Sequence, residues 1–414
     1  MIKHESFKLE NGLRVVVHED LQNPMVFFNL LYDVGSKHEE ETKTGFAHLF
    51  EHLMFGGSVN VKNYDEPLQK AGAENNAFTS PDVTNYYINI PKENLETAFW
   101  LESDRMLSLS FDPKVLDVQK SVVVEEFKQR YLNQPYGDVW HHLRELCYEK
   151  HNYRWPTIGK EISHIENATM EDVKDFFFSH YAPNNAVLVL AGNINLNEAE
   201  NLCLKWFGNI PKRELKKINP KKEPQIKHCK EKKVVSEVPF DALYIAFHCS
   251  GRFEKNYHTA DLISDMLGRG KSSILHQKLV KENNIFNSVN CYCTGSIDTG
   301  LMVIEGKVSN GYNIDLAEQK VWEVLEEIIY VGVEETILQK VKNQSISSQM
   351  FGEIEMMNRA LNLAYYTMFD KTENINQEIE KISSVSKKEV DELATELLNR
   401  NQSVCLKYCA KNEN

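Results

Sequence analysis

Residues 45–58 read GFAHLFEHLMFGGS and contain two histidines and a carboxylate within five positions. On a helix, His48, Glu51 and His52 would share one face. Two imidazoles one helical turn apart can bind a single zinc ion through nitrogens at about 2.0–2.1 Å. Glu51 would then lie beside a zinc-bound water and could take its proton. The spacing therefore predicts a catalytic zinc site.

The sequence around this trio is apolar enough to indicate a buried helix. Its apolar positions are Phe46, Leu49, Phe50, Leu53, Met54 and Phe55. Ionisable side chains that are buried without partners are costly, and a bound metal would remove that cost. The alternative is an amphipathic helix with a solvated polar face. We favour the metal site.

A catalytic zinc ion usually has three protein ligands and one open position. Residues 115–137 are expected to be helical up to an Asn-Gln-Pro stop, and they offer Glu125 and Glu126. Glu126 would share its face with the apolar residues of this helix, whereas Glu125 would lie on a more polar stripe. We therefore expect Glu126 to be the third ligand. The alternative is that both glutamates lie at the surface.

The two halves of the chain show the same order of elements. An apolar helix ending at residues 53–58 is followed by a short helix and two strands, and residues 258–308 repeat this order. Each half also ends with a helix, a turn and a strand, over residues 168–192 and 384–410. The sequence predicts an α+β fold with two homologous α/β domains from an internal duplication. Each domain would be a mostly antiparallel sheet packed with helices.

This repeat sets the expected domain boundaries. We expect a zinc-binding catalytic domain over residues 1–210 and a homologous domain over residues 234–414, which has no H-x-x-E-H and would contact substrate. Between them, residues 211–233 are rich in Lys and Pro, which is typical of an exposed linker. The alternative for this segment is a basic recognition patch.

Composition excludes several classes of protein. The net charge of −13 argues against nucleic-acid binding. No stretch approaches the roughly 20 apolar residues of a membrane span, and the first residues hold no apolar signal core. We therefore expect a cytoplasmic protein with no membrane partner. The eight cysteines contain no C-x-x-C and are expected to be buried free thiols.

The H-x-x-E-H helix and the distal glutamate resemble those of the pitrilysin/insulinase family of zinc metallopeptidases, the inverzincins. Further segments with this resemblance are AENNAFTSPDVTNYY (73–87), WLESDRM (100–106) and GRGKSSILHQKLVKE (268–282). The resemblance implies one zinc ion per chain, held by His48, His52 and Glu126, with Glu51 as general base. It also implies that an extended peptide adds to the edge strand at residues 75–80. The residues implied to bind substrate are Asn76, Ala77, Phe78 and Thr79.

Two further assignments depend on the same resemblance. Family members carry an Arg and a Tyr in the half without zinc, at the spacing of Arg359 and Tyr366, where both contact the scissile carbonyl. Taken alone, these residues would be read as a surface Arg and a core Tyr. Some branches place a Glu seven residues before the zinc-binding Glu, and this chain has Gln119 there. Gln119 could still hydrogen-bond to a zinc ligand, but a Gln at this position differs from the Glu expected for the processing-peptidase branch.

The resemblance implies a zinc endopeptidase that cuts short or unfolded peptides inside a chamber, because larger family members enclose a chamber with four such domains. A chain with two domains would have to dimerise to build a chamber. A homodimer would suffice, and a heterodimer with a related chain is the alternative. The alternatives for function are a peptidase that removes targeting presequences and a non-catalytic subunit of a family heterodimer.

Overall fold

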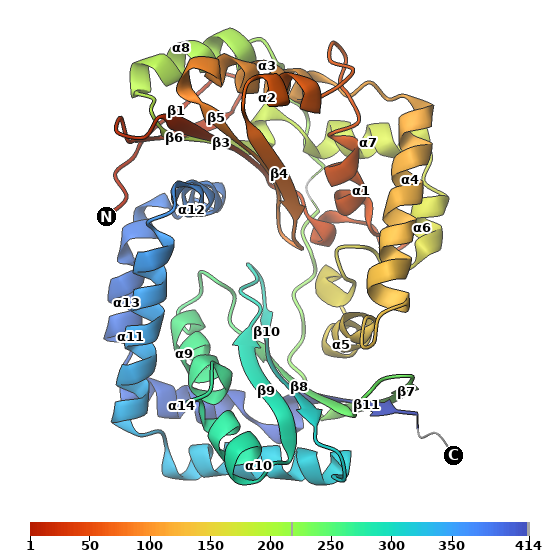
Figure 1. Ribbon diagram of the computed structural model, residues 1–414, viewed down its shortest axis with the longest axis vertical. Coiled ribbons are helices and arrows are strands. Elements are labelled where there is room, and N and C mark those ends of the chain that lie inside the picture. The colour runs from red at the N-terminus through yellow and green to blue at the C-terminus, as the bar shows by residue number, and fades with distance from the viewer. Residues whose placement is uncertain (217, 412–414) are drawn as a thin grey trace. The chain divides into compact units, whose positions relative to one another are not determined.

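The computed structural model describes residues 1–216 and 218–411, so Lys217 of the expected linker and the last residues of the expected second domain lie outside it. The chain forms two compact units (Figure 1). The first unit contains residues 1–127, 155–220 and 350–378, and the second contains residues 128–154, 221–349 and 379–414.

The first unit is built on a six-stranded sheet with the order β1-β2-β6-β3-β5-β4. Its strands are β1 (Glu5–Lys8), β2 (Arg14–Glu19), β3 (Met25–Tyr32), β4 (Glu74–Thr79), β5 (Thr84–Pro91) and β6 (Ala186–Gly192). Only β2 and β6 pair in parallel. The strand β4 is at the edge and pairs with β5 alone among the described strands.

Helices cover both faces of this sheet. α3 (Leu95–Leu107) and α8 (Leu196–Phe207) lie on one face, and α12 (Met356–Met368) lies against β2, β3 and β6 on the other (Figure 1). The aromatic contacts of Phe28 with Phe99 and Phe207 fix which side of β3 faces α3 and α8. The remaining helices of this unit are α1 (Phe46–Leu53), α2 (Asp65–Lys70), α4 (Pro113–Phe127), α6 (Ile162–Glu166) and α7 (Met170–His180).

The second unit repeats this topology. Its sheet has the order β7-β11-β8-β10-β9, which matches β2-β6-β3-β5-β4 strand for strand, and its single parallel pair is β7 with β11. The strands are β7 (Lys230–Ser236), β8 (Ala242–Cys249), β9 (Phe286–Cys293), β10 (Gly300–Val308) and β11 (Ser403–Ala410). The helices are α5 (Val139–Cys147), α9 (Tyr257–Gly268), α10 (Ile314–Val331), α11 (Glu335–Gly352), α13 (Glu378–Ser384) and α14 (Lys387–Leu397). The predicted fold class, two α/β domains with mostly antiparallel sheets, is confirmed.

The compact units differ from the expected division at residues 210 and 234. Residues 128–154, which include α5, belong to the second unit, and residues 350–378, which include α12, belong to the first. The reason is apolar packing: Val139, Leu143 and Cys147 of α5 bury themselves against β8, β10 and β11. A helix from each half of the sequence thus covers the sheet built by the other half.

The segment 211–233 is also more ordered than an exposed linker. Arg213 donates to the backbone carbonyls of Tyr181, Met106 and Leu107. Glu223 is buried and accepts three backbone N–H groups from residues 149–151. The last four residues of the segment already belong to β7.

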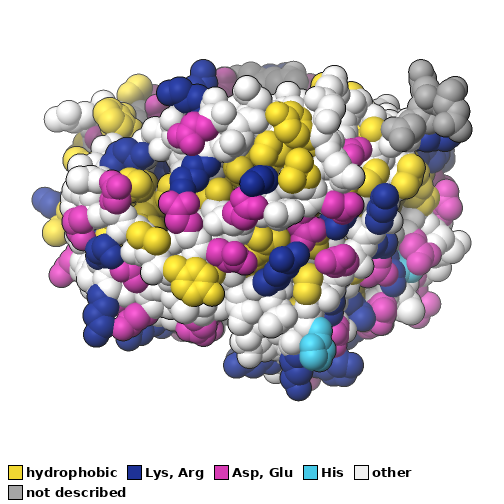
Figure 2. All heavy atoms as spheres, turned by 90° about the horizontal axis from the view of Figure 1, so that it is seen from below, with side chains coloured by type: hydrophobic (Ala, Val, Ile, Leu, Met, Phe, Trp, Pro, Cys, Tyr) yellow, Lys and Arg dark blue, Asp and Glu magenta, His cyan; other side chains and the backbone are white. Residues whose placement is uncertain are grey.

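The described surface carries charges of both signs. On the face shown in Figure 2, acidic and basic side chains alternate with apolar ones, so the described side chains there form no extended basic surface of the kind that binds nucleic acid. Within residues 1–216 and 218–411, every helix is too short or too polar to cross a membrane.

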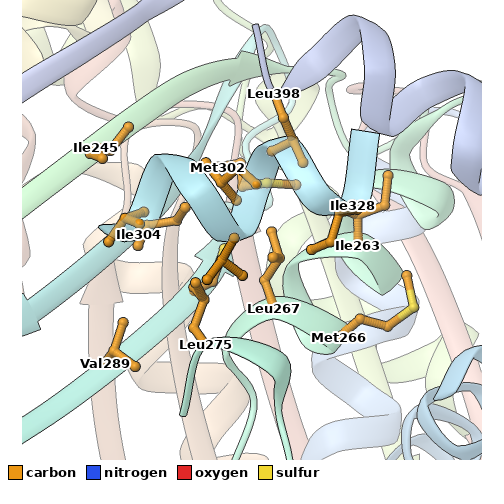
Figure 3. Packing of buried hydrophobic residues seen from close by; sticks show 14 of the residues in the cluster. Ile245, Ile263, Met266, Leu267, Leu275, Val289, Met302, Ile304, Ile328 and Leu398 are labelled. Carbon is orange, nitrogen blue, oxygen red and sulfur yellow. The ribbon is translucent and has the colours of Figure 1, made fainter. Parts of the chain in front are cut away.

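The core of the second unit lies between its sheet and α9, α10 and α14. Figure 3 shows Ile263, Met266 and Leu267 of α9 packed among side chains of the sheet and of α10. Gly268 ends α9 against β9, where a Cβ would lie 1.8 Å from the backbone nitrogen of Cys291. Only glycine permits this close approach of helix and strand.

We expect Gly268→Ala to lower the free energy of unfolding by about 3 kcal/mol, because the added methyl group overlaps backbone that cannot move aside. Denaturant unfolding measures this change. Gly352→Ala is the matched control, because a Cβ there meets only the Asn358 side chain, at 3.9 Å. The control should stay within about 0.5 kcal/mol of the parent, and equal stability of the two variants would contradict this role for Gly268.

Candidate metal centre

Helix α1 presents one apolar face and one polar face. It begins after Gly45, whose φ of 87° lies in the left-handed region, and it buries Phe46, Ala47, Leu49, Phe50 and Leu53. His48, Glu51 and His52 share the opposite face and are half-buried. The sequence indicated a helix buried among apolar residues, but these residues cover only one of its faces. The polar face therefore stays open to a ligand and to water.

The N-terminus of α1 is capped by a buried carboxylate from outside the helix. Glu39 is 3% exposed and accepts the backbone N–H of Gly45 at 2.9 Å and of Ala47 at 2.8 Å. The indole of Trp155 donates to the same carboxylate at 3.1 Å. Burial raises the pKa of Glu39 to about 8, although these hydrogen bonds act to lower it. Glu39 therefore fixes where the histidine-bearing helix begins.

The side chains of His48, His52 and Glu126 converge. Their potential ligand atoms all lie within 4.8 Å of one another, the only such group of three His, Cys, Asp or Glu residues in the part of the chain that the structure describes. Glu126 Oε2 lies 3.7 Å from His48 Nε2 and 3.5 Å from His52 Nε2. Helix α4 turns Glu126 toward α1 and leaves Glu125 exposed.

This donor set fits a zinc ion. Three ligands at about 2.0–2.1 Å in tetrahedral directions lie about 3.3 Å from one another. The distances from Glu126 to the two imidazoles, 3.7 and 3.5 Å, are close to this separation. Two imidazole nitrogens and one carboxylate oxygen are also a ligand set of catalytic zinc sites, which leave one position open. Each of the three side chains is partly exposed, so the open position can be reached from solvent.

Glu51 lies beside this group and is held by strand β4. The hydroxyl of Thr79 donates to Glu51 Oε2 at 2.7 Å. Burial raises the pKa of Glu51 above its ordinary value, and the Thr79 hydrogen bond acts against this shift. Glu51 is not one of the three convergent residues, so it remains available to a water molecule next to them.

The other residues expected to bind substrate lie along β4. Glu74, Asn76 and Phe78 alternate with Asn75, Ala77 and Thr79 in exposure, so β4 has one open face and one face turned toward α1. The backbone N–H of Ala77 donates to the Asn76 side chain at 2.8 Å rather than to β5. This amide is therefore available at the edge of the sheet.

Arg359 and Tyr366 both lie on α12 but in different surroundings. Arg359 is held at the end of β2, where it contacts His18 Nε2 at 2.8 Å and Asp20 at 3.7 Å. Tyr366 is only 3% exposed, within the packing of α12 on the sheet. Gln119 is half-buried on α4 and makes no hydrogen bond to the three convergent residues in the described structure.

Three features of this site were not identified from the sequence. The Thr79 hydrogen bond to Glu51 joins segments that are distant in sequence, whereas Glu39 caps a helix that begins a few residues after it. The contacts of Arg359 with His18 and Asp20 depend on α12 joining the first unit. Of these, only Glu39 had a sequence clue, a carboxylate six residues before the helix-starting Gly45.

Two family models match the chain. The model described as insulinase (peptidase family M16) matches residues 14–160, which contain His48, Glu51, His52 and Glu126. The model described as peptidase M16 inactive domain matches residues 167–345.

The chain is also similar to several named proteins. It is 32% identical over 289 residues to the zinc protease PqqE of Helicobacter pylori, and the match covers 68% of this chain and 65% of that protein. It is 26% identical to the uncharacterized zinc protease YmxG of Bacillus subtilis, over 98% of both chains. It is 25% identical to the mitochondrial-processing peptidase subunit beta of Saccharomyces cerevisiae, over 59% of this chain and 53% of that subunit.

Solved structures share the whole fold. A protease from Helicobacter pylori superimposes with a TM-score of 0.93 and 25% identity, over 98% of this chain and 99% of that one. A peptidase M16 inactive domain from Pseudomonas fluorescens superimposes with a TM-score of 0.89 over 99% of this chain and 98% of that one; at 16% identity this match shows the fold alone.

We expect Glu39→Ala to lower the free energy of unfolding by about 1–3 kcal/mol, because it removes the acceptor of two helix N–H groups and leaves them buried. Glu39→Gln keeps an acceptor and should cost less. The neighbouring Glu40 is exposed and pairs only with surface lysines, so Glu40→Ala should change stability by less than about 1 kcal/mol. Equal effects of Glu39→Ala and Glu40→Ala in denaturant unfolding would refute the capping role.

Proposed function

Because this chain belongs to peptidase family M16, the pitrilysin/insulinase family, we propose that it is a zinc-dependent endopeptidase that hydrolyses short or unfolded peptides. One observation carries the proposal: the potential ligand atoms of His48, His52 and Glu126 lie within 4.8 Å of one another. Glu51 lies beside them, on the same face of α1 as the two histidines. Several similar proteins are named as zinc proteases, and these names support the proposal.

In this proposal the two imidazoles and the Glu126 carboxylate hold one zinc ion. When bound, the zinc ion polarises the scissile carbonyl and makes a water molecule acidic enough to lose its proton near neutral pH. His48 and His52 come from one rigid helical turn, and Glu126 comes from α4, which packs against that helix. Two packed helices therefore set the geometry of all three ligands.

Glu51 then acts as general base. Its carboxylate takes the proton of the attacking water and passes it to the leaving amine. The Thr79 hydroxyl holds one carboxylate oxygen and so fixes the direction of Glu51. Because Thr79 lies on β4, the same strand that orients the base would also carry the substrate.

The edge strand β4 would bind peptides through main-chain hydrogen bonds, which give affinity without a strict sequence requirement. An added strand would replace the local bond from Ala77 N–H to the Asn76 side chain. Asn76, Ala77, Phe78 and Thr79 form the binding stretch. Gln119, which makes no hydrogen bond to the three convergent residues in the described part of the chain, would have to turn toward one of them to support a zinc ligand.

The proposal also assigns Arg359 and Tyr366 to contact the scissile carbonyl from the side of α12. Since the chain carries the zinc motif as well as this pair, two identical chains suffice to build a chamber, and we propose a homodimer. Among similar proteins, the processing-peptidase subunits are named as parts of larger assemblies.

We expect Glu51→Gln to lower kcat by several orders of magnitude while zinc remains bound, because the amide cannot accept the proton from water but leaves the three ligands in place. A quenched-fluorescent peptide assay measures the rate, and elemental analysis of the same sample measures zinc. Normal cleavage by this variant would refute the mechanism.

We expect Glu126→Gln to lower zinc affinity by about tenfold or more, because the neutral amide is a poor zinc ligand. The adjacent Glu125 is exposed and offers the matched control, Glu125→Gln, which should retain one zinc per chain. Competition with a fluorescent chelator measures both affinities. Equal zinc affinity in the two variants would show that Glu126 is not a ligand.

A further inference from the structure

A cavity lies within the first unit, beside the start of β4. Three sets of residues line it: the start of β4, the facing parts of β3 and β5 with Asn23 just before β3, and the start of α12 with the two residues before it. These residues are Asn23, Met25, Phe27, Glu74, Asn75, Asn76, Tyr87, Asn89, Ile354, Glu355, Met356, Met357 and Arg359. None of the proposed zinc ligands borders this cavity.

The cavity lies on the open face of β4, along the strand from Glu51. Thr79, at one end of β4, contacts Glu51, whereas Glu74 and Asn76, toward the other end, line the cavity. At about 3.3 Å per residue, the cavity begins about 10 Å along the strand from Thr79. A peptide paired with β4 would therefore bring a side chain to the cavity about three to five residues from the scissile bond.

Six of the thirteen residues that line the cavity are large and apolar, and two of these are exposed to an unusual degree. Ile354 is 66% exposed and Met357 is 38% exposed, although both are large hydrophobic residues. Across from them, the rings of Phe27 and Tyr87 stack with centroids 5.2 Å apart. Met25, Met356 and Met357 add flexible thioether side chains, which adapt to ligands of different shape. Such a surface favours a large apolar side chain.

The charged groups of the cavity are two carboxylates and one guanidinium, beside four asparagine side chains. Glu74 and Glu355 are exposed carboxylates and form no ion pair in the described structure. The one cation, Arg359, is already engaged by Asp20 and His18. An acidic side chain entering the cavity would therefore meet two carboxylates without a free cation to offset them.

We propose that this cavity is a specificity subsite that selects a large apolar side chain, such as Leu, Met or Phe, and rejects Asp and Glu. The selected residue lies about three to five positions from the cleaved bond of a peptide bound along β4. This proposal rests on the proposed peptidase function. It adds a selective position to a binding mode that is otherwise independent of sequence.

Cleavage of a peptide library by the full, zinc-loaded chain tests the proposal. In each peptide one position is varied among Leu, Phe, Ala and Glu, and the cleaved bond is identified by mass spectrometry. The parent protein should favour Leu or Phe over Ala by about tenfold in kcat/KM at one position in the stated range. Uniform cleavage at all of these positions, or a preference for Glu, would overturn the proposal.

Paired variants locate the preference in this cavity. The double variant Ile354→Ser with Met357→Ser should bring the ratio of Leu to Ala peptides close to one, while cleavage of the Ala peptide persists. Tyr330→Ser is the matched control, because Tyr330 is an exposed large residue of the second unit, 85% exposed, outside this cavity. An unchanged ratio in the double variant would overturn the proposal.

Two carboxylate variants test the rejection of acidic residues. Glu74→Gln combined with Glu355→Gln should raise kcat/KM for the Glu peptide several-fold and leave the Leu peptide unchanged. No gain for the Glu peptide would contradict the role of these carboxylates. Failure of the parent protein to cleave any library peptide would refute the proposed function itself, which separates that outcome from the loss of selectivity in the variants.

Discussion

The first unit must hold two imidazoles and a carboxylate within a few ångströms of one another on a surface that water can reach. No single segment can meet this constraint. Helix α1 supplies both imidazoles, α4 supplies the carboxylate, and packing between the two helices sets their separation. Glu39 fixes where α1 begins, and Thr79 fixes the direction of Glu51. The buried apolar face of α1 keeps the polar face from turning away from α4.

The same arrangement explains why the sheet matters to the chemistry. The strand β4 holds Glu51, the proposed base, at one end and lies beside a partly apolar cavity toward the other. Because β4 is an edge strand, its main-chain groups are available to a peptide. A peptide aligned along this strand would pass from a zone of backbone recognition to a zone of side-chain selection.

Local patterns predicted the elements, and also the three side chains that converge in the structure. The i, i+3, i+4 spacing of His48, Glu51 and His52 placed all three on one helical face, and apolar periodicity distinguished Glu126 from Glu125. The repeated order of elements predicted two sheets of the same topology. These features depend on neighbours in sequence, so periodicity reveals them. The boundaries of the two units could not be predicted from these local patterns. They depend on which sheet α5 and α12 pack against, and each of these helices packs against the sheet of the other half of the sequence. Likewise, the Trp155 contact of Glu39 and the contacts of Thr79 and Arg359 arise only after distant segments have packed.

The central claim is that hydrolysis depends on zinc held by this one site. The most direct measurement compares peptide hydrolysis by the purified full chain in three states: zinc-loaded, stripped by a chelator, and reloaded with one equivalent of zinc. We predict that cleavage disappears on stripping and returns fully with one equivalent. Cleavage that persists in the stripped protein, or its absence in protein that holds one zinc per chain, would contradict the account.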